Sequence, residues 1–154
     1  MQRELIKFKD LRIKKFKDYK KMNHEDKLTE DEVVRILSKQ LEIEGWEITK
    51  QCFGQTKGND IEATKEGVNL IVEAKGAKSN DYSPTKKRDY FDSGQIKSHF
   101  GRALVKIMSE IEKNPENTYA IAHPADDLIK KTIGKLIPQL EKLNIKHYWV
   151  KNEK

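Results

Sequence analysis

The sequence predicts an α/β protein with a mixed central β-sheet flanked by helices, in the element order αβββαβαβ. Two observations carry this prediction. An early helix is followed by short strands joined through a hairpin turn, and each later strand is reached through a helix, as in parallel βαβ units. The chain of 154 residues is long enough for one domain with a buried core.

The N-terminal half is predicted to hold one helix and three strands. Thr29 and Glu32 have the spacing of a capping box, so the helix begins there, and it ends before Gly45. Apolar residues recur at helical spacing within it and predict one buried stripe, which consists of Val33, Val34, Leu37 and Leu41. The predicted strands cover residues 46–53, 59–64 and 69–75.

The C-terminal half alternates helices and strands. Residues 76–92 are polar and show no periodicity, which predicts a long loop. The helix after this loop carries an apolar face formed by Ile96, Phe100, Leu104, Ile107 and Ile111. A strand over 118–123 follows, and then a helix over about 125–143 that Pro138 should kink or split. The last predicted strand covers 145–150.

The positive charge is concentrated in an N-terminal arm. Residues 1–23 hold nine Lys or Arg and three Asp or Glu, so this arm accounts for the whole formal net charge of +6. Such an arm suits a polyanionic partner, and it equally suits a solubilising segment that packs its apolar residues on the domain. We therefore expect a basic arm over 1–23 and a single domain over 24–154.

The composition excludes several classes of protein. No apolar run approaches the roughly 18–20 residues that span a bilayer, and the charged N-terminus is unlike a secretory leader. The single cysteine, Cys52, cannot form an internal disulfide or a zinc cluster. Phosphate-binding loops of the GxxxxGK[ST] and GxGxxG types are absent. We expect a cytoplasmic protein that has no membrane partner.

One strand end carries a chemically distinctive pair. Because side chains alternate along a strand, Glu73 and Lys75 emerge on the same face of the predicted strand 69–75. Asp60 lies on the preceding strand of the hairpin and can come close to Glu73. Two carboxylates repel unless a proton or a cation lies between them, and hard divalent cations favour such oxygen pairs. Lys75 could then hold or deprotonate a water on that metal, or stabilise a phosphate.

Two segments carry a resemblance to a known family. The segment GNDIEA at 58–63, followed by IVEAKG at 71–76, resembles the bipartite signature of the PD-(D/E)XK nuclease superfamily, which includes restriction endonucleases and Holliday-junction resolvases. The predicted element order from Thr29 to about Val150 is similar to the core of that superfamily. Asn59 stands where the family usually has proline. The resemblance implies a restriction-endonuclease-like core.

The resemblance also implies a division of labour. Asp60 and Glu73, with the main-chain carbonyl of Ala74, would bind Mg²⁺ or its substitute Mn²⁺. Lys75 would orient or activate the water that attacks a phosphodiester.

Many members of the superfamily add a glutamate from the first helix and a glutamine from the later helix. Glu30 shares the inward face of its helix, whereas Glu32 is already explained by the capping box, so we favour Glu30. Helix-dipole stabilisation is the other explanation for Glu30, and which of the two glutamates reaches the metal stays open. Gln95 is the expected glutamine.

Two further groups could contact nucleic acid. The helix after the loop carries a polar stripe of Gln95, His99, Arg102 and Lys106. Of these, Arg102 and Lys106 resemble backbone-phosphate contacts, and the alternative for the stripe is an ordinary solvated helix face. For His99 and Lys106 we favour the solvated face. Basic residues of the loop are interleaved with Tyr82, Tyr90 and Phe91, which suits gripping or stacking on a single strand, although a plain surface loop fits equally. These basic residues are Lys78, Lys86, Lys87 and Arg88.

The sequence therefore predicts a metal-dependent endonuclease that hydrolyses phosphodiester bonds in DNA. The alternative is a nucleic-acid-binding module on the same scaffold that does not cut, and the joint presence of Asp60, Glu73 and Lys75 counts against it. Nothing in the sequence positively supports a third class, a small interaction protein whose arm docks an acidic partner. Cutting both strands of a duplex with one site per chain would call for a homodimer. The form of the substrate, and DNA against RNA, stay open.

Overall fold

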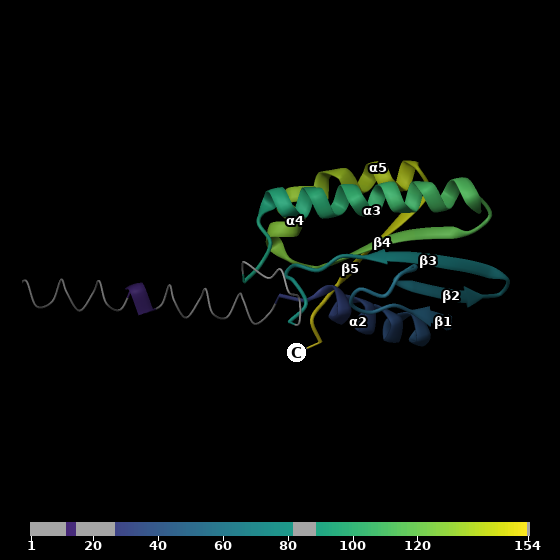
Figure 1. Ribbon diagram of the computed structural model, residues 1–154, viewed down its shortest axis with the longest axis horizontal. Helices are drawn as coiled ribbons and strands as arrows, with labels where there is room; N and C mark the ends of the chain where they lie inside the picture. Colours follow the sequence, from purple (N-terminus) through teal and green to yellow (C-terminus); the bar gives the residue numbers. More distant parts are fainter. Residues whose placement is uncertain (1–11, 15–26, 82–88, 154) are drawn as a thin grey trace, which may run out of the picture.

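The computed structural model describes residues 12–14, 27–81 and 89–153. Five strands form one mixed sheet in the spatial order β1-β2-β3-β4-β5, and helices cover both of its faces (Figure 1). The predicted fold class is confirmed, because the sheet is mixed and helices flank it in the predicted order. This α/β fold is consistent with a restriction-endonuclease-like core. Most of the basic arm, and Lys86, Lys87 and Arg88, lie outside the described residues.

The elements follow the predicted order closely. The strands are β1 (Glu47–Gln51), β2 (Ile61–Lys65), β3 (Val68–Ala74), β4 (Thr118–Pro124) and β5 (Ile145–Val150). The helices are α2 (Glu30–Ile43), α3 (Ser93–Lys113), α4 (Asp127–Ile133), the 3₁₀ helix η1 (Gly134–Leu136) and α5 (Ile137–Lys142). Strands β1, β2 and β3 pair antiparallel, whereas β3, β4 and β5 are parallel. Within the described residues, no helix is both long and apolar enough to cross a membrane.

The predicted helix over 125–143 is split, as expected, but the break lies before Pro138. The chain passes through η1, and Pro138 then occupies the first turn of α5. A proline is tolerated there because the first backbone N–H groups of a helix have no partner within the helix.

The two faces of the sheet pack on different helices. Figure 1 shows α2 against one face and α3, α4 and α5 against the other. Alternation along β3 places Val72 and Ala74 in the core on the α2 side, and Ile71 in the core on the α3 side. Glu73 therefore points to the α3 side, close to where β3 ends.

The start of α2 is fixed directly to the end of β3. The predicted capping box is present: the Glu32 N–H donates to Thr29 Oγ1 at 3.2 Å, and the Thr29 N–H donates to Glu32 Oε2 at 2.8 Å. Past β3, the Ala77 N–H donates to the Leu28 carbonyl at 2.8 Å. At Gly76 the two segments touch so closely that a Cβ atom would lie 2.5 Å from the Glu30 nitrogen.

We predict that Gly76→Ala destabilises the protein by about 1–3 kcal/mol, because the added methyl group meets backbone atoms that cannot rotate away. The matched control is Gly101→Ala in the interior of α3, where an added Cβ meets nothing within 4 Å. That control should gain about 0.5–1 kcal/mol, the usual difference between Ala and Gly in a helix. Urea unfolding measures both, and a Gly76→Ala protein as stable as wild type would contradict the close contact.

Candidate active site

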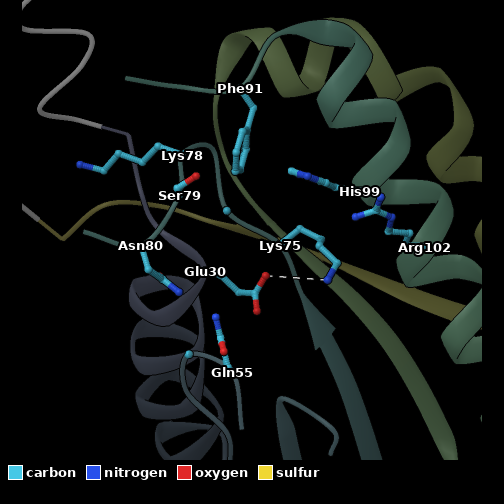
Figure 2. Close-up of a pocket in the computed structure, with 11 residues that line it drawn as sticks. Glu30, Gln55, Lys75, Lys78, Ser79, Asn80, Phe91, His99 and Arg102 are labelled. Atoms are coloured by element: carbon cyan, nitrogen blue, oxygen red, sulfur yellow. Dashed lines mark ion pairs between the residues drawn. The ribbon is translucent and has the colours of Figure 1, made fainter. Parts of the chain in front are cut away.

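The centre of the candidate site is the pair that alternation along β3 predicts. The Lys75 ammonium lies 3.0 Å from Glu73 Oε1 and 3.8 Å from Glu30 Oε2, so one lysine joins the end of β3 to the start of α2. Figure 2 shows the Glu30 carboxylate directed at Lys75. Glu73 is buried, with 5% of its surface exposed. The structure therefore brings Glu30, Glu73 and Lys75 together.

Asp60 is a further carboxyl group of this cluster and lies near Glu73. It comes immediately before β2, and its Oδ2 accepts a hydrogen bond from the Ala74 N–H at 2.7 Å. Burial, followed by the charge of Glu73, raises the pKa of Asp60 to about 7. The hairpin thus places Asp60 close enough to Glu73 for the charge of Glu73 to oppose the ionisation of Asp60.

The structure separates the two glutamates of α2. Glu30 lies beside Lys75, and burial raises its pKa although the Lys75 charge opposes the shift. Glu32 is held in the capping box with Thr29. Of the two, Glu30 is the one whose carboxylate reaches the cluster.

Lys75 is held in its charged form by its neighbours. Burial alone would lower its pKa, but the carboxylates of Glu73 and Glu30 outweigh burial and the pKa is raised. At neutral pH the side chain is therefore an ammonium, which can donate hydrogen bonds to a water or to a phosphate oxygen.

Lys106 is a member of the cluster that sequence reasoning missed. Its ammonium lies 2.5 Å from Glu73 Oε2 and 2.7 Å from the Gly58 carbonyl oxygen. The expectation that Lys106 lies on a solvated face holds only in part: the side chain is 36% exposed, but α3 crosses the sheet with this edge towards Glu73, which the ammonium contacts. The stripe of polar residues on α3 was visible in the sequence, but the sequence does not show which part of it faces β3.

Two cavities meet at the cluster. The first, of about 450 Å³, is lined by Glu30, Gly54, Gln55, Lys75, Gly76, Lys78, Ser79, Asn80, Phe91, His99 and Arg102 (Figure 2). The second, of about 440 Å³, is lined by Glu30, Lys50, Gly54, Gln55, Thr56, Lys57, Gly58, Asn59, Asp60, Glu62, Glu73, Lys106 and Glu110. Both expected phosphate contacts among the described residues, Lys78 and Arg102, line the first cavity.

Two residues of the α3 stripe differ from expectation. His99 is half-buried, lines the first cavity and packs edge-to-face on Phe91, so its assignment to a solvated face is wrong. Gln95 lines neither cavity. Its side chain instead completes a second capping box, in which the Asp92 N–H donates to Gln95 Oε1 at 3.1 Å. The Asp92–Gln95 spacing is the signal in the sequence that indicates this role.

A pair of neutral histidines lies on the same face of the sheet, beyond Lys75. His123 is 1% exposed, and its Nδ1 lies 2.9 Å from His147 Nε2. Burial, followed by repulsion from His147 and Lys75, lowers the pKa of His123 to about 3. Burial lowers that of His147 to about 4. Neither ring adds charge to the site at neutral pH.

The cluster does not form a closed metal cage by itself. Among the described residues, no three His, Cys, Asp or Glu side chains come together as a metal-binding group. Asp60 and Glu73 provide two carboxylates, while Lys75 and Lys106 both contact Glu73. Such an arrangement can hold a cation only together with water or substrate oxygens.

We predict that Asp60→Asn stabilises the fold when divalent cations are absent. Because the pKa of folded Asp60 is raised, the stability that its protonated form contributes is present below about pH 4 and is lost as the pH rises through about 7. The amide cannot ionise and keeps an acceptor for the Ala74 N–H. The advantage of the variant should grow by about 1–3 kcal/mol between pH 5 and pH 8 in urea unfolding with EDTA. Glu42→Gln, on the exposed side of α2, is the control and should show no such growth. An effect of Asp60→Asn that is equal at both pH values would contradict the electrostatic explanation.

Comparison with known proteins gives one structural likeness. No protein-family model and no curated protein matches the sequence. The crystal structure of an XisH family protein from Nostoc punctiforme is similar, with 21% sequence identity and a TM-score of 0.45. The match covers 77% of this chain and 91% of that chain.

Proposed function

We propose that this protein is a metal-dependent endonuclease that hydrolyses phosphodiester bonds in DNA. The observation that carries the proposal is the convergence of Asp60, Glu73 and Lys75 at one end of the sheet, with Glu30 beside them. Two buried carboxyl groups and a charged lysine at a surface opening are costly to assemble. A cation and a phosphate would use all of these groups.

The donor set fits Mg²⁺, with Mn²⁺ as a substitute. Mg²⁺ binds through one or two carboxylates, keeps several waters and accepts substrate phosphates, so it needs no closed protein cage. Asp60, Glu73 and the Ala74 carbonyl would hold it, with Glu30 within reach. The Lys106 ammonium already sits between a Glu73 carboxylate oxygen and the Gly58 carbonyl, which indicates that hard oxygens here accept a cation. Bound there, the metal would supply the Lewis acidity that activates water and offsets phosphate charge.

With the metal bound, Lys75, Arg102 and Lys78 would act on the attacking water and the DNA strand. The Lys75 ammonium would orient the attacking water or stabilise the negative charge that develops on the phosphate. Glu73 and Glu30 hold Lys75 in place at 3.0 Å and 3.8 Å. Arg102 and Lys78 would position the backbone of the strand without reading its sequence.

We predict that Glu73→Gln and Lys75→Met each lower the rate of DNA cleavage by about 10²-fold or more, since the first removes a carboxylate that would hold the metal and the second removes the ammonium that would act on the water or the phosphate. Supercoiled plasmid and a labelled panel of branched, single-stranded and duplex DNA serve as substrates in Mg²⁺, Mn²⁺ or EDTA. Lys97→Met, which alters an exposed lysine of α3 that lines neither cavity, is the matched control and should cut like wild type.

Two outcomes would contradict this function. Cutting that survives Glu73→Gln would come from a contaminant. The absence of cutting on every substrate, with salt-dependent binding that Glu73→Gln leaves unchanged, would favour the non-cutting nucleic-acid-binding module.

A second prediction concerns metal affinity in the absence of DNA. Lys106→Met removes the ammonium that neutralises Glu73, so the affinity for Mn²⁺ should rise by about 3- to 10-fold, equivalent to about 0.7–1.4 kcal/mol. Glu73→Gln should weaken binding, and Lys97→Met, at an exposed position of α3 that lines neither cavity, should leave it unchanged. Isothermal titration calorimetry with MnCl₂ measures the Mn²⁺ affinity of all three variants and of the wild type. Equal affinities for wild type and Lys106→Met would show that Lys106 and the metal do not compete for Glu73.

A further inference from the structure

The cavity beside Lys75 differs in charge from the carboxylate side of the site. Among the residues that line it, three are basic and one is acidic, whereas the cavity around Asp60 and Glu73 has five acidic and three basic residues. The carboxylate side suits a cation. The side that Lys75, Lys78 and Arg102 share suits an anion next to the reacting phosphate.

One wall of this cavity is aromatic. Figure 2 shows the Phe91 ring pointing into the cavity. The His99 ring packs edge-to-face on it, with ring centroids 4.4 Å apart and an interplanar angle of 82°. The Phe91 N–H donates to the Ala77 carbonyl at 2.9 Å, which ties this residue to the segment that follows β3. Burial, with the charges of Lys75 and Arg102, lowers the pKa of His99, so its ring is neutral. The wall is therefore a fixed, uncharged aromatic surface.

Polar, uncharged side chains also line the cavity. These are Gln55, Ser79 and Asn80, whose amide and hydroxyl groups can both donate and accept hydrogen bonds, and the Glu30 carboxylate lies between Gln55 and Asn80 (Figure 2). An aromatic face, neutral hydrogen-bonding groups and basic groups are together the features that a nucleotide needs. A base stacks on the ring, its edge meets the amides, and its phosphate meets the cations.

We propose that this cavity binds one unpaired nucleotide adjoining the phosphate to be cut. Its volume of about 450 Å³ lies within the range of about 300–1,000 Å³ typical of small-ligand sites, the size class to which a single nucleotide belongs. Inside a duplex the faces of a base are covered by its stacked neighbours, so Phe91 can reach a base only where it is unstacked. The proposal rests on the proposed function and narrows its substrate to DNA with a single-stranded part.

Binding in EDTA tests the proposal without any cleavage. The probes are a fluorescein-labelled 20-nucleotide single strand, its duplex, and a fork with unpaired arms, each followed by anisotropy. Phe91→Ala should weaken binding to the single strand and the fork by about 5- to 100-fold, the effect of losing one base–aromatic stack, and change duplex binding less than twofold.

Phe91 also packs on the core, so further variants separate stacking from folding. Phe91→Leu keeps apolar volume without a ring and should lose single-strand affinity like Phe91→Ala, whereas Phe91→Tyr should keep it. Val105→Ala, at an exposed position of α3, is the control and should bind every probe like wild type.

The outcomes separate this proposal from the function on which it rests. Equal losses on single strand and duplex, or no loss with Phe91→Leu, would overturn the nucleotide cavity even if the protein cuts DNA. Ring-dependent binding of single strands would support the cavity even if Mg²⁺ produced no cutting.

Discussion

The arrangement of the site depends on one close contact, between Gly76 and the start of α2. Because Gly76 has no Cβ, the Glu30 backbone can approach the end of β3, where a methyl group would lie 2.5 Å from its nitrogen. The same approach lets Ala77 bond to Leu28 across the two segments. Glu30 belongs to a helix on one side of the sheet and Lys75 to a strand end that faces the other. This contact keeps the start of α2 beside the end of β3, where the Glu30 carboxylate lies 3.8 Å from the Lys75 ammonium.

The charged side chains gathered around Glu73 reduce the stability of the fold. Asp60 is ionised only against the cost of burial and the charge of Glu73, which is why its pKa is raised to about 7. Lys75 and Lys106 offset the charge of Glu73 from two sides, at 3.0 Å and 2.5 Å. A fold selected for stability alone would replace such a cluster with apolar residues. Its presence at the mouth of two cavities is therefore an argument for chemistry at this place.

The sequence could predict the parts of the site that local rules determine. Strand alternation placed Glu73 and Lys75 on one face, and the hairpin brought Asp60 to them. The capping box separated Glu32 from Glu30. Contacts between α3 and the sheet could not be predicted in this way, because the direction in which α3 crosses the strands depends on packing of the whole core. That direction brings Lys106 to Glu73, although its spacing alone fits a solvated helix face equally well.

The segment after β1 connects the two sides of the site. Gly54 and Gln55 line both cavities, and the Gly54 N–H donates to Asp31 Oδ1 at 2.9 Å, one residue after Glu30. The first turn of α2 thus positions the Glu30 carboxylate. Through Asp31 it also positions the segment that lines both cavities. If a metal occupies the acidic side and a nucleotide the basic side, both lie against this one turn. Both ligands would therefore contact the same stretch of backbone, so the position of α2 prepares the two halves of the site together.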